Sequence, residues 1–477
     1  DAQESRGLGD VYKRQVVSFG ERHGFKVFSW QFPNMTQELA QELLPECPKE
    51  ELPITRNKND EEEKLPVYID FSHPRAKELL AAQWKDRLDA GIRGSMVDFG
   101  DVVPDEAVFY DGRRGDEMHN AYAYQYAKNY RELFEQKYGD DHVLYTRGAA
   151  PGSQHFACQF GGDQLTSFQG LKYAIAGGLS AAASGLPFWG VDAGGYDGFP
   201  DQETYLRWTE YAAFCPLMRF HGTEPREPWE YDAFTVKVYR YYAWLRENLR
   251  PYIVSVAAEA HKLGIPMMRP LAMIYPEDQE ATKVWDEYLF GENLLVAPVS
   301  DETEEREIYF PKGRWISLWN LNDEISGPVQ RSVEVPIDKI PVYVREGSFL
   351  PLRLNESLKL GESMSESETE MILAVVPQND SIVKETLYER SGAKTCCGME
   401  KNGETIQLQI SGRTAELYVM LAGIHWKNTE AIVNGRTLTK VTAREGLYFT
   451  EGYLELEEGI LVKINPSAES VIKIQKK

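Results

Sequence analysis

The feature that most constrains the fold is a change of apolar pattern part-way along the chain. From Gly24 to about Met268, short apolar runs alternate with stretches of helical periodicity. Beyond about Asn293, short alternating runs are separated by Gly, Asn and Pro. Repeated βα units form parallel sheets, whereas short alternating runs are typical of antiparallel β domains. The sequence therefore predicts an α/β domain followed by β domains.

The α/β part can be divided into individual elements. The pattern predicts strands and helices in alternation, with strands at 24–30, 94–99 and 143–147 and helices at 74–90 and 119–138. If the strands close into a barrel, catalytic side chains lie at their carboxyl ends. The side chains that fall at such ends are Trp30, Asp98, Arg147 and Asp192. Periodicity alone leaves an open doubly wound sheet as the alternative.

The first residues have a distinct origin in this interpretation. Ser5 to Gln15 reads SRGLGDVYKRQ, the translation of one frame of a common transposon-type sequencing-library adapter. A natural amphipathic N-terminus is the alternative, but chance does not readily produce a match of this length. We predict that residues 1–15 derive from an adapter and exclude them from fold reasoning. The natural N-terminus is then expected upstream of this chain.

The predicted domain order combines these observations. Two β-sandwiches follow the barrel, and a polar stretch at 354–367 contains the boundary between them. The domains are a (β/α)8 TIM barrel that lacks its first strand or strands at 16–292, a proximal β-sandwich at 293–358 and a distal β-sandwich at 359–477. An acidic run at 57–64, NKNDEEEK, is predicted to be a surface loop. Because an open barrel exposes unpaired strand edges, we expect the isolated chain to be insoluble or inactive.

Charge and cysteine usage exclude several classes of partner. A formal net charge of −22, without a Lys/Arg cluster in the sequence, argues against nucleic acid. The 5 cysteines are scattered without zinc-site or CxxC spacing, which favours a reducing, cytoplasmic location. No apolar run reaches the roughly 20 residues that span a bilayer, so no membrane partner is expected. A homo-oligomer is left open.

Carboxylates in glycine-flanked loops are candidate catalytic residues. Asp98 follows an apolar run in GSMVDFGD, Asp163 lies in FGGD and Asp192 lies in FWGVDAGGY. Hydrolysis of a glycosidic bond with retention needs a carboxylate nucleophile and a carboxylic acid, roughly 5–5.5 Å apart. A single Asp of this kind is more often a turn or cap residue, and Asp101 competes locally with Asp98. Three such loops favour a catalytic cluster.

Other readings of the same residues are less well supported. The Asp-Phe-Gly tripeptide at Asp98 also occurs in protein kinases, but no HRD-type loop, Gly-rich phosphate loop or APE segment accompanies it. His119 and His221 have no Glu or His at metal-ligand spacing. Two carboxylates supply both steps of a retaining mechanism, so neither a metal nor an organic cofactor is expected.

Taken together, these segments resemble glycoside hydrolase family 31, which includes α-glucosidases, α-xylosidases and sulfoquinovosidases. The resemblance runs from about Gly24 to the end and is strongest between Gly94 and Asp232. It continues through three further segments: YLFGENLLVAPV at 288–299, FPKGRW at 310–315 and IPVYVR at 340–345. The resemblance implies a TIM barrel, followed by two β-sandwiches and preceded in the family by another, and a retaining mechanism on α-linked sugars.

The resemblance also implies residue roles. Asp98 matches the family's nucleophile and Asp163 its acid/base. The residues similar to those that hydrogen-bond sugar hydroxyls are Arg147, Asp192 and His221, and those similar to the aromatic walls of the sugar site are Trp30 and Trp189. The expected substrate is an oligosaccharide or small α-glycoside.

The sequence constrains the identity of the substrate sugar less tightly. The loop at Asp98, the stretch at His119 and the segment from His221 to Asp232 resemble α-xylosidases more than α-glucosidases. Met96, however, stands where those xylosidases carry a Lys that contacts substrate, and Met96 and Gln164 also occur in sulfoquinovosidase-like members. We therefore expect a hydrolase of terminal α-glucosides or α-xylosides. The alternatives are a sulfoquinovosidase-like or α-galactosidase-like member, an α-transglycosylase, or a non-catalytic carbohydrate-binding protein.

Overall fold

The computed structural model describes residues 5–57, 67–365, 367–378, 381–413 and 415–477. Two compact units divide the chain, Asp1–Gly162 and Asp163–Lys477, and each has its own buried core. Helix α1 (Ser5–Arg22) begins the described chain. Most of the acidic run at 57–64, and the first four residues of the predicted adapter segment, lie outside the described residues.

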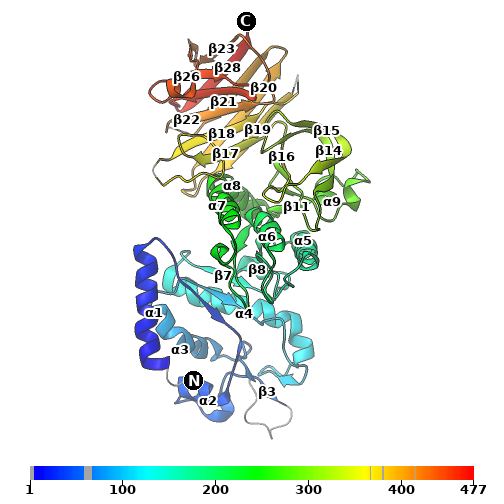
Figure 1. Cartoon of the computed structure of the whole chain (residues 1–477). Coiled ribbons are helices and arrows are strands. Elements are labelled where there is room, and N and C mark those ends of the chain that lie inside the picture. The colour runs from blue at the N-terminus through cyan, green and yellow to red at the C-terminus, as the bar shows by residue number, and fades with distance from the viewer. Residues whose placement is uncertain (1–4, 58–66, 366, 379–380, 414) are drawn as a thin grey trace. The chain divides into compact units, whose positions relative to one another are not determined.

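A parallel sheet organises the first unit (Figure 1). Its neighbouring strands are, in order, β1 (Phe28–Gln31), β5 (Gly94–Val97), β7 (Val143–Thr146) and β8 (Cys158–Phe160). The register aligns Trp30 with Met96 and Met96 with Tyr145. All residues of β5 are buried, as expected for a parallel sheet covered on both faces. Because the strands run in the same direction, their carboxyl ends lie at one edge of the sheet.

Three further helices of the first unit share an apolar core with this sheet. They are α2 (Gln37–Leu43), α3 (Ala76–Asp89) and α4 (Gly115–Tyr138), and short strand pairs join β2 (Asn34–Met35) to β4 (Val67–Tyr68) and β3 (Arg56–Asn57) to β6 (Ala107–Val108). Trp84 of α3 and Tyr130 of α4 are fully buried, and the Trp84 indole N–H donates to the Tyr130 hydroxyl at 3.1 Å. The predicted helices at 74–90 and 119–138 are confirmed.

The strand predicted from residue 24 begins later. The backbone N–H groups of His23 and Phe25 donate to the Gly20 carbonyl at 3.0 and 2.8 Å, so this segment closes the end of α1. Gly24 has a φ of 77°, a left-handed conformation that glycine adopts without a Cβ clash. The extended backbone therefore starts only at Phe28.

The second unit begins with further βα elements. They are α5 (Phe168–Ala183), β9 (Trp189–Asp192), α6 (Gln202–Ala213), β10 (Leu217–Arg219), α7 (Ala233–Asn248) and α8 (Arg250–Leu263), with β9 and β10 parallel. Polar side chains fix the helix starts: Ser167, Asp201 and Asp232 each accept a hydrogen bond from a backbone N–H of the first turn. Gly264, with a φ of 70°, ends α8.

β-sheets form the remainder of the second unit, as predicted. The first sheet contains β11 (Met268–Pro270), β12 (Tyr288–Phe290), β13 (Leu294–Val296), β16 (Val342–Arg345), β14 (Glu305–Ser317) and β15 (Glu324–Glu334), with the short helix α9 (Leu271–Ile274) packed against it. Strands β14 and β15 are both long, and they pair with each other.

Two further sheets enclose the C-terminal core. One contains β17 (Phe349–Leu354), β18 (Thr369–Val375), β22 (Leu417–Ala422), β27 (Gly459–Ile464), β26 (Gly452–Glu455) and β25 (Thr439–Lys440). The other contains β19 (Ser381–Tyr388), β20 (Lys394–Asn402), β21 (Thr405–Ser411), β28 (Glu469–Lys476), β23 (Thr429–Val433) and β24 (Arg436–Thr437). Apolar side chains from both sheets share one core, and α8 packs against β17 and β19 (Figure 1).

None of the helices in the described part of the chain combines the length and the apolar character that crossing a bilayer requires.

Candidate active site

Asp98 occupies the carboxyl end of β5 in the first unit. The residue is 5% exposed, and its backbone N–H donates to the Gln31 carbonyl at 2.8 Å, which continues the pairing with β1. The indole N–H of Trp30 donates to Oδ2 of Asp98 at 3.0 Å, and the backbone N–H of Phe99 donates to Oδ1 at 2.8 Å. One donor from β1 and one from the residue that follows Asp98 thus hold the carboxylate in one orientation.

The residue after Asp98 has an unusual backbone conformation. Phe99 has a φ of 60°, which costs a non-glycine residue about 1–3 kcal/mol and is common at functional sites. Gly100 follows, and a Cβ there would lie 2.6 Å from the Tyr126 ring. The turn therefore needs a glycine, and it places the Phe99 ring edge-on to Trp30, with centroids 6.4 Å apart.

Arg147 supplies positive charge at this edge. It follows β7, and its Nε lies 3.6 Å from Oδ1 of Asp98. Its Nε and Nη2 also donate to Asp101 at 3.1–3.2 Å, and its guanidinium stacks 4.2 Å from the Phe99 ring centroid. Asp101 and Phe99 therefore hold Arg147 beside Asp98. The sequence-predicted residues Trp30, Asp98 and Arg147 are brought together.

A buried ion pair lies at the ends of β9 and β10 in the second unit. Asp192 is fully buried and pairs with Arg219. Burial raises the pKa of Asp192 to about 6, although Arg219 opposes the rise, and the charge of Asp163 adds to it. Within the described residues, Oδ2 of Asp192 has no hydrogen-bond partner. A buried carboxylate oxygen of this kind can accept a hydrogen bond from a ligand hydroxyl.

The loop after Asp192 is tied to the segment after Asp163. Oε1 of Gln164 accepts the Asp192 backbone N–H at 3.3 Å, and the Gln164 carbonyl accepts the Tyr196 N–H at 2.8 Å. Arg226, which is 6% exposed, donates to the carbonyls of Gly195 and Tyr196 at 2.9 and 3.1 Å. Gly195 itself has a φ of 80°, and a Cβ there would lie 2.5 Å from the Thr166 backbone. These contacts set the loop that carries Asp192.

The other predicted residues of the second unit occupy different settings. Asp163 is exposed at the start of the unit. His221 is exposed after β10, with its ring 5.4 Å from that of Tyr196. Trp189 lies against α5, where a Cβ on Gly178 would come within 2.7 Å of its Nε1. The role of Trp189 as an aromatic wall, and the catalytic role of Asp163, stay predictions.

Sequence reasoning missed three residues of this arrangement. Phe99 was not singled out, because a phenylalanine in the sequence does not indicate a left-handed backbone. Arg219 and Arg226 were not singled out either, although Arg219 ends a strand beside Asp192 and could have been found by that criterion. Among the described residues, no group of three or more His, Cys, Asp or Glu side chains is arranged to hold a metal ion.

Comparison with known proteins identifies the family of this chain. A model described as "Glycosyl hydrolases family 31 TIM-barrel domain" matches residues 12–256, and one described as "Glycosyl hydrolase family 31 C-terminal domain" matches residues 264–350. The chain belongs to glycoside hydrolase family 31. The resemblance inferred from the sequence is thereby confirmed, and the TIM barrel is favoured over an open doubly wound sheet.

Relatives in family 31 carry different activities in their names. An isomaltosyltransferase of Sporosarcina globispora is 32% identical over 430 residues, 85% of this chain and 39% of the relative. An alpha-xylosidase of Saccharolobus solfataricus is 34% identical over 296 residues, 60% of this chain and 39% of the relative. The chain thus spans about two fifths of the length of these curated relatives.

Solved structures share the fold of this chain. The cycloalternan-forming enzyme from Listeria monocytogenes, in complex with a pentasaccharide substrate, superposes with a TM-score of 0.88 at 23% identity. The match covers 97% of this chain and 47% of that one. At this identity the likeness concerns the fold, and it confirms a barrel region followed by β domains.

Proposed function

We propose that this chain is part of a retaining α-glycosidase that acts on terminal α-linked sugars of oligosaccharides or small glycosides. In this proposal an oxygen of ionised Asp98 attacks the anomeric carbon while Asp163 donates its proton to the leaving glycosidic oxygen. The product of this step is a β-linked glycosyl ester of Asp98. Asp163, now a carboxylate, then takes a proton from water, which displaces Asp98 and restores both residues.

The observation that carries this proposal is the set of groups that surround the Asp98 carboxylate. A buried carboxylate at the carboxyl end of a barrel strand is held by the Trp30 and Phe99 N–H groups and faces the Arg147 guanidinium. These partners are two donors and a cation, and they orient the carboxylate for the attack that a nucleophile makes. An Asp with only a turn-forming function would not need a cation positioned by a second carboxylate, Asp101.

Asp192 supports the binding of a neutral, hydroxyl-rich ligand. Its carboxylate is fully buried, and within the described residues its Oδ2 lacks a hydrogen-bond donor. A sugar hydroxyl can supply that donor, and the energy of satisfying a buried acceptor would contribute to affinity. We propose that Asp192, with Arg219 as its counter-charge, binds one or two hydroxyls of the terminal sugar.

An α-transglycosylase is the second candidate. It uses the same glycosyl-enzyme intermediate but passes the glycosyl group to a sugar hydroxyl in place of water. The isomaltosyltransferase relative favours it, because that match extends over 85% of this chain, whereas the alpha-xylosidase match extends over 60%. The Met96 and Gln164 positions keep a sulfoquinovosidase-like glycone among the candidates.

The test is a stereochemical assay of a full-length protein that contains this chain. It would be offered p-nitrophenyl α-glucoside, α-xyloside, α-galactoside and α-sulfoquinovoside, and the first-formed sugar would be examined by proton NMR before mutarotation. We expect release from one glycone with the α-anomer formed first. Initial formation of the β-anomer would contradict the retaining mechanism. Silence on all four from a folded protein would favour the carbohydrate-binding alternative. New oligosaccharides at high substrate concentration would identify a transglycosylase.

A further inference from the structure

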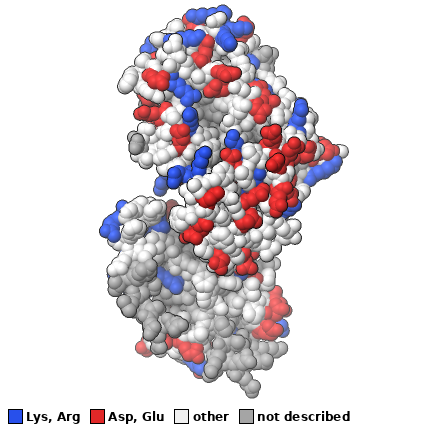
Figure 2. Space-filling model, in the orientation of Figure 1, with Lys and Arg blue, Asp and Glu red and all other residues white. Residues whose placement is uncertain are grey.

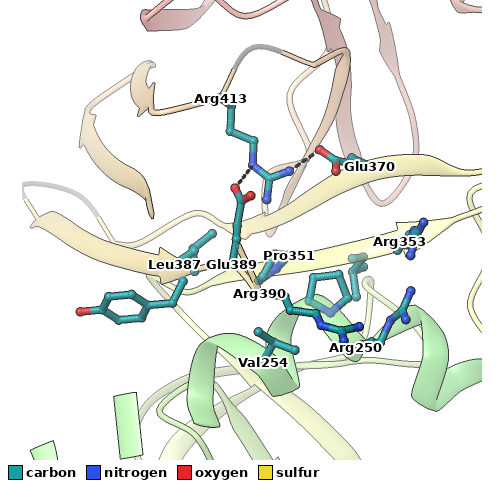
Figure 3. A pocket seen from close by; sticks show the side chains of 12 residues that line it. Arg250, Val254, Pro351, Arg353, Glu370, Leu387, Glu389, Arg390 and Arg413 are labelled. Atoms are coloured by element: carbon teal, nitrogen blue, oxygen red, sulfur yellow. Dashed lines mark hydrogen bonds and ion pairs between the residues drawn. The ribbon is translucent and has the colours of Figure 1, made fainter. Parts of the chain in front are cut away.

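A pocket of about 260 Å³ lies in the second unit, where the start of α8 meets β17 and the residues that follow β19 (Figure 3). Part of its lining is apolar and comes from Pro251 and Val254 of α8, Pro351 of β17 and Leu387 of β19. The rest is charged, with Arg250, Arg353, Arg390 and Arg413 beside Glu370 and Glu389. None of these residues belongs to the proposed catalytic machinery.

The two carboxylates of the pocket are already paired. Arg413, whose side chain is 11% exposed, forms an ion pair with Glu370, and its Nε lies 3.6 Å from Glu389. The same Nε donates to the Thr395 hydroxyl at 3.0 Å. Figure 3 shows Arg413 between the two carboxylates. Arg413 is therefore engaged by both carboxylates in a structural cluster and is not counted as a ligand-binding cation.

The charges of the other three arginines are less fully balanced by carboxylates. Arg250 approaches Glu247 at 3.4 Å through Nε, and Arg353 pairs with Glu368 through Nη2. Among the residues that the structure describes, Arg390 has no carboxylate within 4.0 Å, and neither Arg250 nor Arg390 donates a hydrogen bond to a protein atom. Figure 3 shows these guanidinium groups gathered near Pro351. Their remaining N–H groups are available to a ligand.

Nearby lysines add to the positive potential. Tyr388 lines the pocket, and the ammonium groups of Lys262 and Lys394 lie 3.4 and 5.9 Å from the centroid of its ring. Acidic side chains are widespread on the face drawn in Figure 2, yet Lys and Arg gather at the level of α8 and β17. In a chain with a net charge of −22, such a local gathering of cations favours an anionic ligand at this place.

We propose that this pocket binds a small tetrahedral oxyanion, namely the phosphate or sulfonate group of a small metabolite. Guanidinium groups donate parallel N–H bonds to such oxyanions, and a dianion relieves the mutual repulsion of Arg250, Arg353 and Arg390. The volume accommodates an anion with a small organic group, which the apolar lining would contact. Binding here would join α8 to the C-terminal sheets through the ligand.

Isothermal titration calorimetry on the purified protein, at constant ionic strength held with sodium chloride, tests this proposal. The probes are inorganic phosphate, sulfate, glucose 6-phosphate and glucose. We expect phosphate and sulfate to bind and glucose not to bind. Glucose 6-phosphate binding about tenfold tighter than phosphate would identify an organic phosphate as the occupant, and equal affinities would identify the free ion.

Variants locate the binding. Arg390→Gln and Arg250→Gln, both at exposed or half-exposed side chains, should each weaken phosphate binding by about tenfold or more. Arg331→Gln, at an exposed position on β15 outside the pocket, is the matched control and should bind like the wild type. Thermal unfolding of each variant verifies folding. Absence of binding by all the anions, or equal binding by the wild type, Arg390→Gln and Arg250→Gln, would overturn the proposal.

Discussion

The indole N–H of Trp30 donates to Oδ2 of Asp98 at 3.0 Å, and so links the carboxyl ends of two adjacent parallel strands. The backbone N–H of Phe99 occupies the other carboxylate oxygen at 2.8 Å. Asp98 is thus oriented by its own chain and by the neighbouring strand. In the proposed role of Asp98 as the nucleophile, this fixed orientation means that little freedom is lost when the substrate arrives.

Trp30→Phe removes this hydrogen bond and keeps an aromatic ring. A hydrogen bond to a charged group contributes about 1.5–3 kcal/mol, so we expect kcat/KM to fall by about ten- to a hundredfold. If Trp30 only provided an aromatic surface, the Phe variant would retain nearly full activity. Trp285→Phe, at a side chain that is 49% exposed, is the control and should leave kcat/KM unchanged.

Arg147→Met should lower kcat more than it raises KM, because the charge that faces Asp98 is lost while Trp30 remains. Asp101→Asn should have a smaller effect of the same kind, since it weakens the contacts that position Arg147. A double-mutant cycle measures the coupling of the two residues. Strictly additive effects of the single changes would contradict a shared role.

Asp192 predicts a pH dependence of sugar affinity. Its pKa is raised to about 6, so the carboxylate is protonated progressively as the pH falls below that value. Protonation weakens the pair with Arg219 and removes acceptor capacity. We expect the affinity for the product sugar, measured by calorimetry, to fall between pH 7 and pH 5. Asp192→Asn should bind weakly at every pH, and a wild-type affinity that is flat over this range would contradict the assignment.

The same group has the opposite effect on stability. The folded-state pKa of Asp192 lies above the model value of 3.8, so the folded protein binds the proton more tightly than the unfolded chain does. The contribution of this carboxyl to stability is therefore present below about pH 4 and is lost as the pH rises through about 6. The difference in free energy of unfolding between the wild type and Asp192→Asn should decrease over that interval.

Arg207→Met should destabilise the second unit. Arg207 is 2% exposed, pairs with the buried Glu210 at 3.1 Å and donates to the carbonyls of Val335 and Pro336 at 2.7 and 3.1 Å. Its loss removes the donor to two backbone carbonyls and the partner of Glu210, and together these losses should cost about 3–5 kcal/mol. Denaturant unfolding followed by tryptophan fluorescence measures the change.

Two controls define the Arg207 prediction. Arg331→Met alters an exposed arginine and should be nearly neutral. Glu210→Gln should cost less than Arg207→Met, because burial already raises the pKa of Glu210 and favours its neutral form. If Glu210→Gln were the more destabilising change, the ion pair and not the carbonyl contacts would dominate.

The sequence predicted the elements that position the candidate site residues of the first unit. Trp30, Asp98 and Arg147 were expected together because each follows an apolar run that ends a parallel strand, and parallel strands bring their carboxyl ends to one edge. The catalytic roles of Asp98 and Asp163 were expected from the family resemblance, and they stay predictions. These inferences depend on local pattern, which a sequence displays directly.

Other features depend on contacts between distant segments. Phe99 has a left-handed backbone and Gly100 lies close to Tyr126 of α4, and nothing in the local sequence requires either feature. The start of β1 at Phe28 depends on how α1 ends. The arginine pocket assembles α8, β17 and the ends of other strands, so no cluster of basic residues appears along the chain.

The most direct test of the central claim is the configuration of the azide product formed by two variants of the full-length enzyme. With an activated aryl α-glycoside, Asp98→Ala should be nearly inactive, and added azide should restore turnover as the β-glycosyl azide, since azide replaces the missing nucleophile. Asp163→Ala should instead yield the α-glycosyl azide, because azide then attacks the intermediate on Asp98. The opposite assignment of anomers, or undiminished hydrolysis by Asp98→Ala, would contradict the roles proposed for these two residues.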